Sequence, residues 1–247
     1  MPYVARTSTA MRKPYKKRTY ARKTSARSMY TIAKRVLKSN TETKSRITAY
    51  STGGMILSHN VPRLVAAQCL QTSQGTDGDG TSGNRIGIAV EPVGLKLYME
   101  LAQEQPLSGT NMVNGNIFVK VWILKAHHSS INTSNDFLRL ISSNTMLAPV
   151  QRRTHDVVKS FTINLKNEYN WWNAGSALDV APAYKTRTIY IPMNNIKKYL
   201  YENDVTDVGK SFDYCVHAVA FSAHPAADTS SQIASIKLNT EFFFKDS

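Results

Sequence analysis

Apolar and polar residues alternate with a period of two along much of the chain beyond Asn40. The clearest run covers residues 93–101, where the apolar positions are Val93, Leu95, Leu97, Met99 and Leu101. A period of two places successive side chains on opposite faces of a strand. This run therefore predicts a strand with one buried face.

Residues 117–124 alternate in the same way, but Phe118, Trp122 and Leu124 make the second face largely apolar as well. That pattern is typical of a strand covered on both faces, in the middle of a sandwich. A third strand is predicted at residues 161–165. Weaker patterns bring the expected total to about eight strands, at residues 55–59, 63–70, 187–192, 214–222 and 233–244.

Helical patterns beyond Asn40 are short, at residues 134–141 and 194–201, and we interpret them as loop insertions. Long connections at residues 71–84, 102–116 and 166–186 suit a jelly roll better than a meander. The predicted fold class is all-β, a single eight-stranded jelly-roll sandwich with a disordered basic N-terminal arm. We place the arm at residues 1–46 and the jelly-roll domain at residues 47–247.

The arm itself has two parts. Residues 2–27 have little apolar content, so they cannot bury enough surface to offset the entropy lost on ordering. At residues 28–38 the spacing of apolar residues predicts a short basic amphipathic helix, with Met29, Ile32, Ala33, Val36 and Leu37 on one face. Two interpretations remain open: the helix docks on the folded domain, or it folds only on nucleic acid.

Charge is concentrated in the arm. The chain has 31 Lys and Arg against 17 Asp and Glu, a net charge of +14. Twelve basic residues and no acidic ones lie in residues 1–40, so nineteen basic residues against seventeen acidic ones leave only +2 for the rest. Cations that neutralise phosphates give strong, sequence-independent, salt-dependent affinity. The candidate nucleic-acid-binding residues are Arg6, Arg12, Lys13, Lys16, Lys17, Arg18, Arg22, Lys23, Arg27, Lys34, Arg35 and Lys38.

Two further features of the arm concern its partners. Its tyrosines can stack on unpaired bases or reflect composition alone; they are Tyr3, Tyr15, Tyr20 and Tyr30. One cluster of basic residues can also serve as a nuclear localisation signal read by host import machinery, namely Arg12, Lys13, Lys16, Lys17 and Arg18.

Motifs for catalysis and metal binding are weak. Residues 78–83 match a literal GxGxxG pattern, but no helical pattern follows, and Asp77 and Asp79 would repel a pyrophosphate. A calcium site at these two carboxylates, shared between subunits, remains an alternative. His127 and His128 are adjacent and are expected to be exposed at a strand end.

The remaining histidines, at positions 59, 155, 217 and 224, cannot be assembled into a triad from sequence alone. We predict no catalytic residue, no metal ligand set, no cofactor and no enzymatic activity. Cys69 and Cys215 lie in apolar segments and are expected to be buried free thiols. No apolar run reaches the length of a signal peptide or a membrane span, so we expect no membrane insertion.

Three aromatic residues, Tyr169, Trp171 and Trp172, lie in a segment without strand pattern. Tyr and Trp dominate binding hot spots, which makes them candidates for a subunit-interface anchor. A loop folded back on its own core explains them equally well.

The order of these features resembles the capsid proteins of small circular single-stranded DNA viruses. A basic arm is followed by a strand at 63–70, a glycine-rich turn, the element Gly83-Asn84-Arg85-Ile86-Gly87, the strand at 93–101 and a last strand ending at Lys245. The element resembles an "RIG" feature that precedes a jelly-roll strand in those capsids. The arm differs from many circovirus arms, which are nearly continuous arginine, because it mixes Lys, Arg, Thr and Ser.

The resemblance implies a single jelly roll and a small icosahedral (T=1) shell, commonly of about sixty copies, with the arms facing inward. It also implies a viral genome as partner, single-stranded DNA rather than RNA, an unidentified receptor, and a location in the virion and, during assembly, the host nucleus. One rival is a cellular single-strand nucleic-acid-binding protein with a β-sandwich or barrel, whose basic and aromatic residues would lie on the folded domain. Another is a lectin-like or cupin-like jelly roll, which would need a polar cluster or metal set.

Overall fold

The computed structural model describes residues 29–33, 36, 42–74, 84–104, 116–127, 137–139, 144–166, 183–202, 209–223, 227 and 229–246. Its contacts divide the chain into two units, residues 1–41 and 42–247. In the first unit, residues 29–33 and 36 are helical, as the sequence predicted there. Among the described residues, no helix has the length and apolar character needed to cross a membrane.

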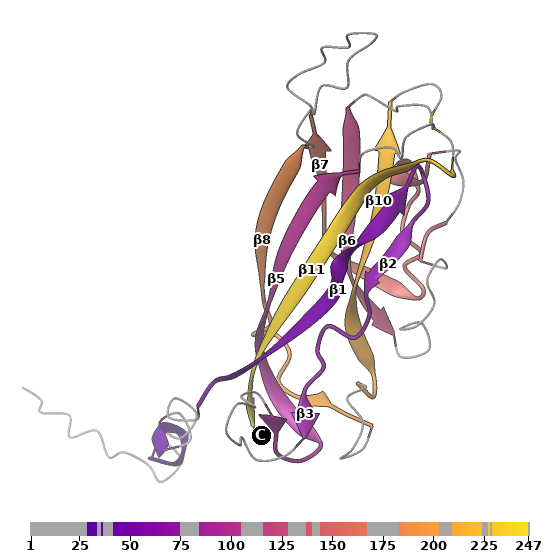
Figure 1. Ribbon diagram of the computed structural model, residues 1–247. Helices are drawn as coiled ribbons and strands as arrows, with labels where there is room; N and C mark the ends of the chain where they lie inside the picture. Colours follow the sequence, from indigo (N-terminus) through magenta and orange to yellow (C-terminus); the bar gives the residue numbers. More distant parts are fainter. Residues whose placement is uncertain are drawn as a thin grey trace, which may run out of the picture. The chain divides into compact units, whose positions relative to one another are not determined.

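The second unit is a sandwich of two antiparallel sheets (Figure 1). One sheet has the order β1-β11-β5-β8 and the other the order β2-β10-β6-β7. The bounds of these principal strands are β1 Lys44–Ser58, β2 Arg63–Ala66, β5 Ala89–Gln103, β6 Ile117–His127, β7 His155–Leu165, β8 Tyr184–Pro192, β10 Phe212–Ser222 and β11 Gln232–Asp246.

Three short strands and one 3-10 turn complete the described elements. Strands β3 (Ser73–Gln74) and β4 (Asn84–Arg85) form a parallel pair, and β9 (Tyr199–Leu200) adds to the start of β5. The 3-10 turn η2 covers Thr145–Leu147.

The strand order identifies the fold. If the principal strands are numbered one to eight along the chain, the sheets read 1-8-3-6 and 2-7-4-5. The first and last strands pair, and most successive strands cross between the sheets, which is the double Greek key of a jelly roll. The jelly-roll prediction is confirmed. Strand β1 begins at Lys44, so the folded domain starts inside the range that the sequence assigned to the arm.

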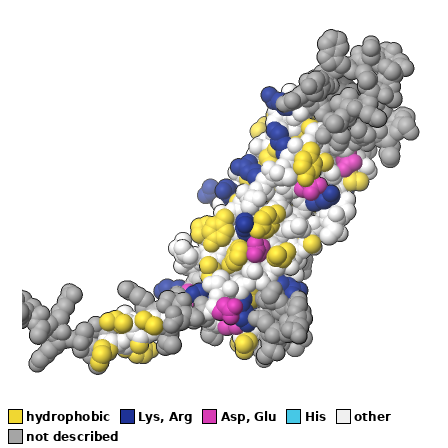
Figure 2. Space-filling model, turned by 60° about the vertical axis from the view of Figure 1, so that its left-hand side comes forward, with side chains coloured by type: hydrophobic (Ala, Val, Ile, Leu, Met, Phe, Trp, Pro, Cys, Tyr) yellow, Lys and Arg dark blue, Asp and Glu magenta, His cyan; other side chains and the backbone are white. Residues whose placement is uncertain are grey.

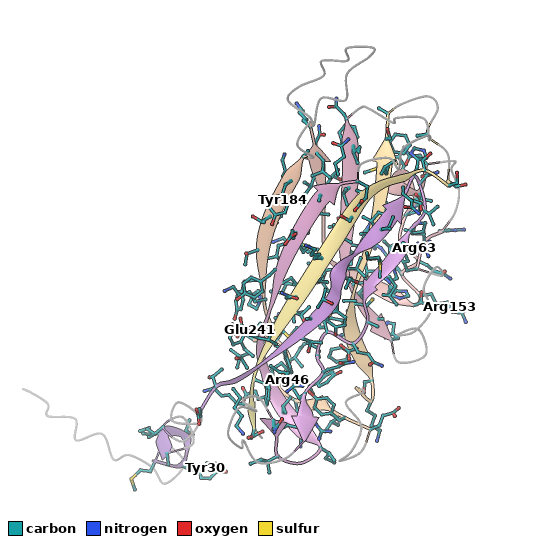
Figure 3. All side chains as sticks on the ribbon, viewed as in Figure 1. Tyr30, Arg46, Arg63, Arg153, Tyr184 and Glu241 are labelled. Carbon is teal, nitrogen blue, oxygen red and sulfur yellow. The ribbon has the colours of Figure 1, made fainter. Side chains whose placement is uncertain are left out.

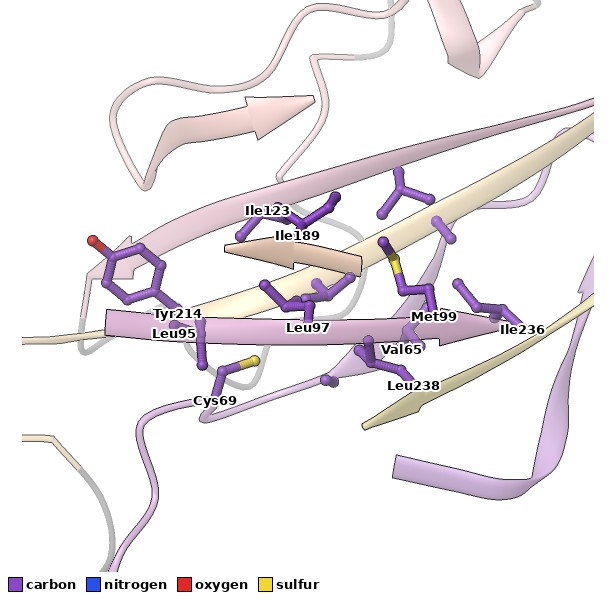
Figure 4. Close-up of a cluster of buried hydrophobic side chains, with 14 of the residues drawn as sticks. Val65, Cys69, Leu95, Leu97, Met99, Ile123, Ile189, Tyr214, Ile236 and Leu238 are labelled. Atoms are coloured by element: carbon purple, nitrogen blue, oxygen red, sulfur yellow. The ribbon is translucent and has the colours of Figure 1, made fainter. Parts of the chain in front are cut away.

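Apolar side chains from both sheets meet in one core (Figure 4). The predicted positions Leu95, Leu97, Met99 and Leu101 of β5 are almost fully buried. Val93 is only partly buried, so the prediction was wrong there. A bulge between the pairs Phe243↔Gly94 and Phe244↔Pro92 shifts the phase of the strand at this point.

The short helical patterns were also wrong where the structure describes them. Residues 194–195 form a turn, and Tyr199–Leu200 pair with β5. Residue 138 makes an isolated antiparallel bridge with Val150 rather than a helical turn. In both places, pairing with another extended segment satisfies the backbone better than one or two turns of isolated helix would.

Strand β1 is irregular in its middle. Tyr50 pairs with Leu238, but the next pair toward the end of β1 is Met55 with Ile236. Four residues of β1, 51–54, therefore stand opposite the single residue Lys237, and Ser51 and Gly54 adopt positive φ angles of 56° and 86°. The edge strand is consequently split into two ladders by this irregular four-residue insertion.

Candidate nucleic-acid interface

The predicted nucleic-acid-binding residues lie in the arm, and all twelve fall outside the described residues. The nuclear-localisation cluster is among them. The candidate interface residues Tyr169, Trp171 and Trp172, and the carboxylates Asp77 and Asp79, also lie outside. The structural description of the candidate interface is therefore confined to the folded body that follows the arm.

The junction between arm and body is anchored by Lys44, the first residue of β1. Its Nζ lies 3.0 Å from Asp246 Oδ2 at the end of β11 and donates to the carbonyl of Asn84 at 3.0 Å. The backbone N–H of Ile86 donates to Asp246 Oδ1 at 3.1 Å. The chain thus enters the sandwich beside both the last strand and residues 84–87.

Arg85 of that element is buried. Its side chain is 0% exposed, its guanidinium carbon lies 4.0 Å from the centre of the Tyr201 ring, and its Nη1 donates to the carbonyl of Gly87. Gly87 has a φ of +81°, a conformation that favours glycine. Arg85 and Gly87 therefore form a packed turn, and Arg85 is not available to phosphates.

A buried carboxylate lies near this end of the sandwich. Asp213 is 0% exposed; its Oδ1 accepts from the backbone N–H groups of Leu70 (3.1 Å) and Tyr214 (2.6 Å), and its Oδ2 from the hydroxyl of Tyr199 (3.1 Å). Burial raises the pKa of Asp213 to about 7, against the lowering effect of these hydrogen bonds. Asp213 links β10, β9 and the segment after β2, which is a structural role.

Charges on the exposed face of the β1-β11-β5-β8 sheet are balanced locally. Lys237 Nζ lies 2.8 Å from Glu100 Oε1, and that hydrogen bond lowers the pKa of Glu100. The Tyr98 hydroxyl donates to Glu241 Oε2 at 2.8 Å, and Lys96 Nζ lies 4.7 Å from the centre of the Tyr98 ring. In Figure 2, apolar side chains lie between charged ones on the visible face.

Tyrosines add aromatic surface to the same sheet. Tyr184 and Tyr190 of β8 are 55% and 50% exposed, and Figure 3 labels Tyr184 and Glu241 on this sheet. A shallow depression of about 360 Å³ is lined in part by Tyr98, Glu100 and Lys237. Exposed tyrosine rings of this kind can stack on unpaired bases.

The outer face of the β2-β10-β6-β7 sheet carries a second apolar cluster. Trp122, Leu124, Phe137 and Cys215 are among its buried members, and η2 and the residues around Leu138 and Val150 cover it. Trp122 and Leu124 are the residues whose apolar character predicted a strand covered on both faces, and that prediction is confirmed. The structure also confirms that Cys69 and Cys215 are buried and free, and that His127 is exposed at the end of β6.

This cluster contains a group of residues that sequence reasoning missed. One nitrogen of His155, one of His217 and the sulfur of Cys215 lie within 4.8 Å of one another. His155 is in β7, whereas Cys215 and His217, which are 60 and 62 positions further along the chain, are in β10. Only the alternation of Cys215 and His217, which places both on one face of a strand, was readable from sequence.

No protein-family model matches the chain, and no curated protein does. Among solved structures, the chain is similar to a chain of the T13 IBDV viral particle, with 8% identity, a TM-score of 0.32 and coverage of 83% of this chain and 32% of that one. This chain thus spans about a third of that protein's length.

A second similar structure is the 60-mer BFDV capsid protein, with 13% identity, a TM-score of 0.32 and coverage of 84% of this chain and 93% of that one. The assignment of the jelly roll rests on strand order and register within this chain.

Proposed function

We propose that this chain is a viral capsid protein that assembles into a small icosahedral shell and packages single-stranded nucleic acid through its arm. The observation that carries the proposal is that most of the net positive charge lies in the segment before the folded domain. Twelve basic residues precede β1, and the residues beyond 40 carry a net charge of only +2. A nearly neutral jelly roll limits repulsion between copies, while the arm supplies affinity for polyphosphate.

The body has features suited to contacts between copies. Several large apolar side chains of the body are exposed on strands or beside them, including Ile47 at 63%, Ile56 at 43% and Val157 at 47%. Exposed apolar side chains of this kind can contribute to the apolar core of an interface between copies. The proposal gives the chain a structural role without catalysis, in the virion.

The finer parts of the proposal follow from the resemblance of the sequence to circovirus-like capsids. They are a shell of about sixty copies, a single-stranded DNA genome, and nuclear import of new chains through Arg12, Lys13, Lys16, Lys17 and Arg18.

The test compares three versions of the protein by negative-stain electron microscopy and by absorbance at about 260 and 280 nm, where nucleic acid and protein absorb. They are the full chain, a chain lacking residues 1–40, and a chain whose twelve arm cations are replaced by Gln at unchanged length. We expect uniform shells from the full chain that contain nucleic acid, and loss of most nucleic acid in both variants. A monomer under all salt and pH conditions tried would overturn the proposal.

A cellular single-strand nucleic-acid-binding protein is the second candidate, because Tyr184, Tyr190 and Lys96 lie on an exposed sheet. In that case, binding of a fluorescent single-stranded oligonucleotide would survive removal of residues 1–40. Replacing these three residues by Ala would abolish it. The capsid proposal predicts the opposite result for both changes.

A further inference from the structure

Three potential metal ligands meet on the outer face of the β2-β10-β6-β7 sheet. His155 is the first residue of β7, and Cys215 and His217 alternate on β10. Strand β6 lies between them, with Ala126 opposite His155, Leu124 opposite Cys215 and Trp122 opposite His217. The exposed fractions are 0% for His155 and 1% for both Cys215 and His217.

Hydrogen bonds fix the ring of His155. The Thr154 hydroxyl donates to the carbonyl of Gln151 at 3.2 Å, and its oxygen lies 2.9 Å from His155 Nδ1. In the neutral tautomer with the proton on Nδ1, that nitrogen donates to Thr154 and Nε2 carries the lone pair. Metal-binding histidines are commonly held this way, with the second nitrogen donating to an oxygen of the protein.

His217 supplies the second imidazole. Its Nδ1 is buried and has no hydrogen-bond partner among the described residues. A buried nitrogen in this state is costly unless something binds it. A neutral imidazole keeps a lone pair on one ring nitrogen, and this is the form of histidine that binds a metal ion.

The spacing is close to that of a metal centre. The three ligand atoms lie within 4.8 Å of one another. Around tetrahedral zinc, two such ligand atoms stand about 3.3 to 3.6 Å apart. Movements of about 1 Å, through the broad outer torsion of histidine, would close the difference.

We propose that His155, Cys215 and His217 bind a thiophilic transition-metal ion of the Zn²⁺ class. On binding, the Cys215 thiol loses its proton to solvent and the thiolate donates to the metal.

The proposed ion would act as a staple, and it is independent of the proposed function. It would connect β7 to β10 across β6, beside Phe137, whose ring centre lies 4.0 Å from that of His217. Met146 also packs against this cluster. Because a thioether such as that of Met146 favours Cu⁺ over Zn²⁺, binding of the two ions is tested separately.

The experiment uses the full chain without a histidine tag, freed of metal with a chelator and then titrated with Co²⁺. We expect one equivalent to give a thiolate-to-cobalt absorption band and the intense visible bands of tetrahedral cobalt. Zn²⁺ or Cu⁺ should then displace the Co²⁺, and the better ion should raise Tm by about 5 to 10 °C. The matched variants are Cys215→Ala and Cys69→Ala, since Cys69 is equally buried but lies in the main core.

The site is supported if Cys69→Ala binds Co²⁺ as the wild type does and Cys215→Ala does not. No cobalt band in the wild type, or the same band in Cys215→Ala, would overturn it. If Cys215→Ala does not fold, X-ray absorption of the Zn²⁺-loaded wild type decides. One sulfur with nitrogen neighbours supports the site, and a shell without sulfur refutes it.

Discussion

The guanidinium of Arg85 stacks on the ring of Tyr201, 4.0 Å from its centre, inside the sandwich. The Tyr201 hydroxyl in turn donates to the carbonyl of Leu70 at 2.9 Å. A buried arginine on an aromatic face is held by stacking and by hydrogen bonds that lysine cannot reproduce. The element that resembles a capsid motif is therefore explained by folding.

The first prediction concerns this pair. Arg85→Lys should lower the free energy of unfolding by about 1 to 3 kcal/mol, because the planar stack and the bond to Gly87 are lost. Urea unfolding measures the change. Arg63→Lys, at an exposed position of β2, is the control and should have little effect. Equal effects of the two substitutions would contradict a structural role for Arg85.

The second prediction contrasts two glycines. A Cβ at Gly209 would lie 1.8 Å from the hydroxyl of Tyr199 and 2.5 Å from the backbone oxygen of Phe212. Tyr199 is 1% exposed and cannot move aside, so Gly209→Ala should cost more than about 2 kcal/mol.

Gly94→Ala is the matched comparison. Its Cβ would lie 2.3 Å from the hydroxyl of Tyr190, but that side chain is half exposed and can swing into solvent. We expect a cost below about 1 kcal/mol. Thermal unfolding of both variants tests the contrast, and a larger loss for Gly94→Ala would show that Tyr190 is held more firmly than its exposure indicates.

The third prediction separates the outer cluster from the main core. Phe137 is 0% exposed and packs on Trp122 and His217, so Phe137→Ala should destabilise the protein by about 3 to 5 kcal/mol. In metal-free protein, Cys215 should then react with a thiol reagent faster, while Cys69 stays protected.

Mass spectrometry of the labelled peptides distinguishes the two cysteines. Ile123→Ala, in the main core, is the control that should expose Cys69 rather than Cys215. Equal labelling of both cysteines in Phe137→Ala would mean that the residues over the outer cluster, 137–139 and 144–150, do not open independently of the sandwich.

The fourth prediction follows from the arm. Replacing Arg12, Lys13, Lys16, Lys17 and Arg18 by Gln should reduce the slope of log affinity against log salt by about 3 to 4, since each contact with a single strand contributes about 0.7. Fluorescence anisotropy with single-stranded DNA at several salt concentrations measures the slope. The same number of substitutions at exposed body cations should leave it unchanged. An unchanged slope in the arm variant would place the phosphate contacts elsewhere.

The sequence predicted the strands because the alternation of apolar and polar residues along each one indicates which face is buried, and this pattern depends only on residues close together in the chain. It failed at Val93, where a bulge created by the pairing with β11 reverses the phase. It failed at residues 194–201, where Tyr199 is held by Asp213 and by pairing with β5. Both failures arise from contacts with residues distant in the chain.

The proximity of His155 to Cys215 and His217 could not be predicted for the same reason. It depends on the order β10-β6-β7 and on the register of two ladders, and neither produces a recognisable residue spacing in the sequence. The arm is the opposite case: its charge was evident from composition alone.

The split in β1 has a consequence for solubility. A long, regular outermost strand presents a row of unused N–H and C=O groups that can recruit a strand from another molecule and begin a fibril. In β1, the left-handed residues Ser51 and Gly54 interrupt that row halfway along the strand. Under the proposed function, many copies of the chain come together in one shell, and the interruption would favour contacts through side chains over open-ended growth of a sheet.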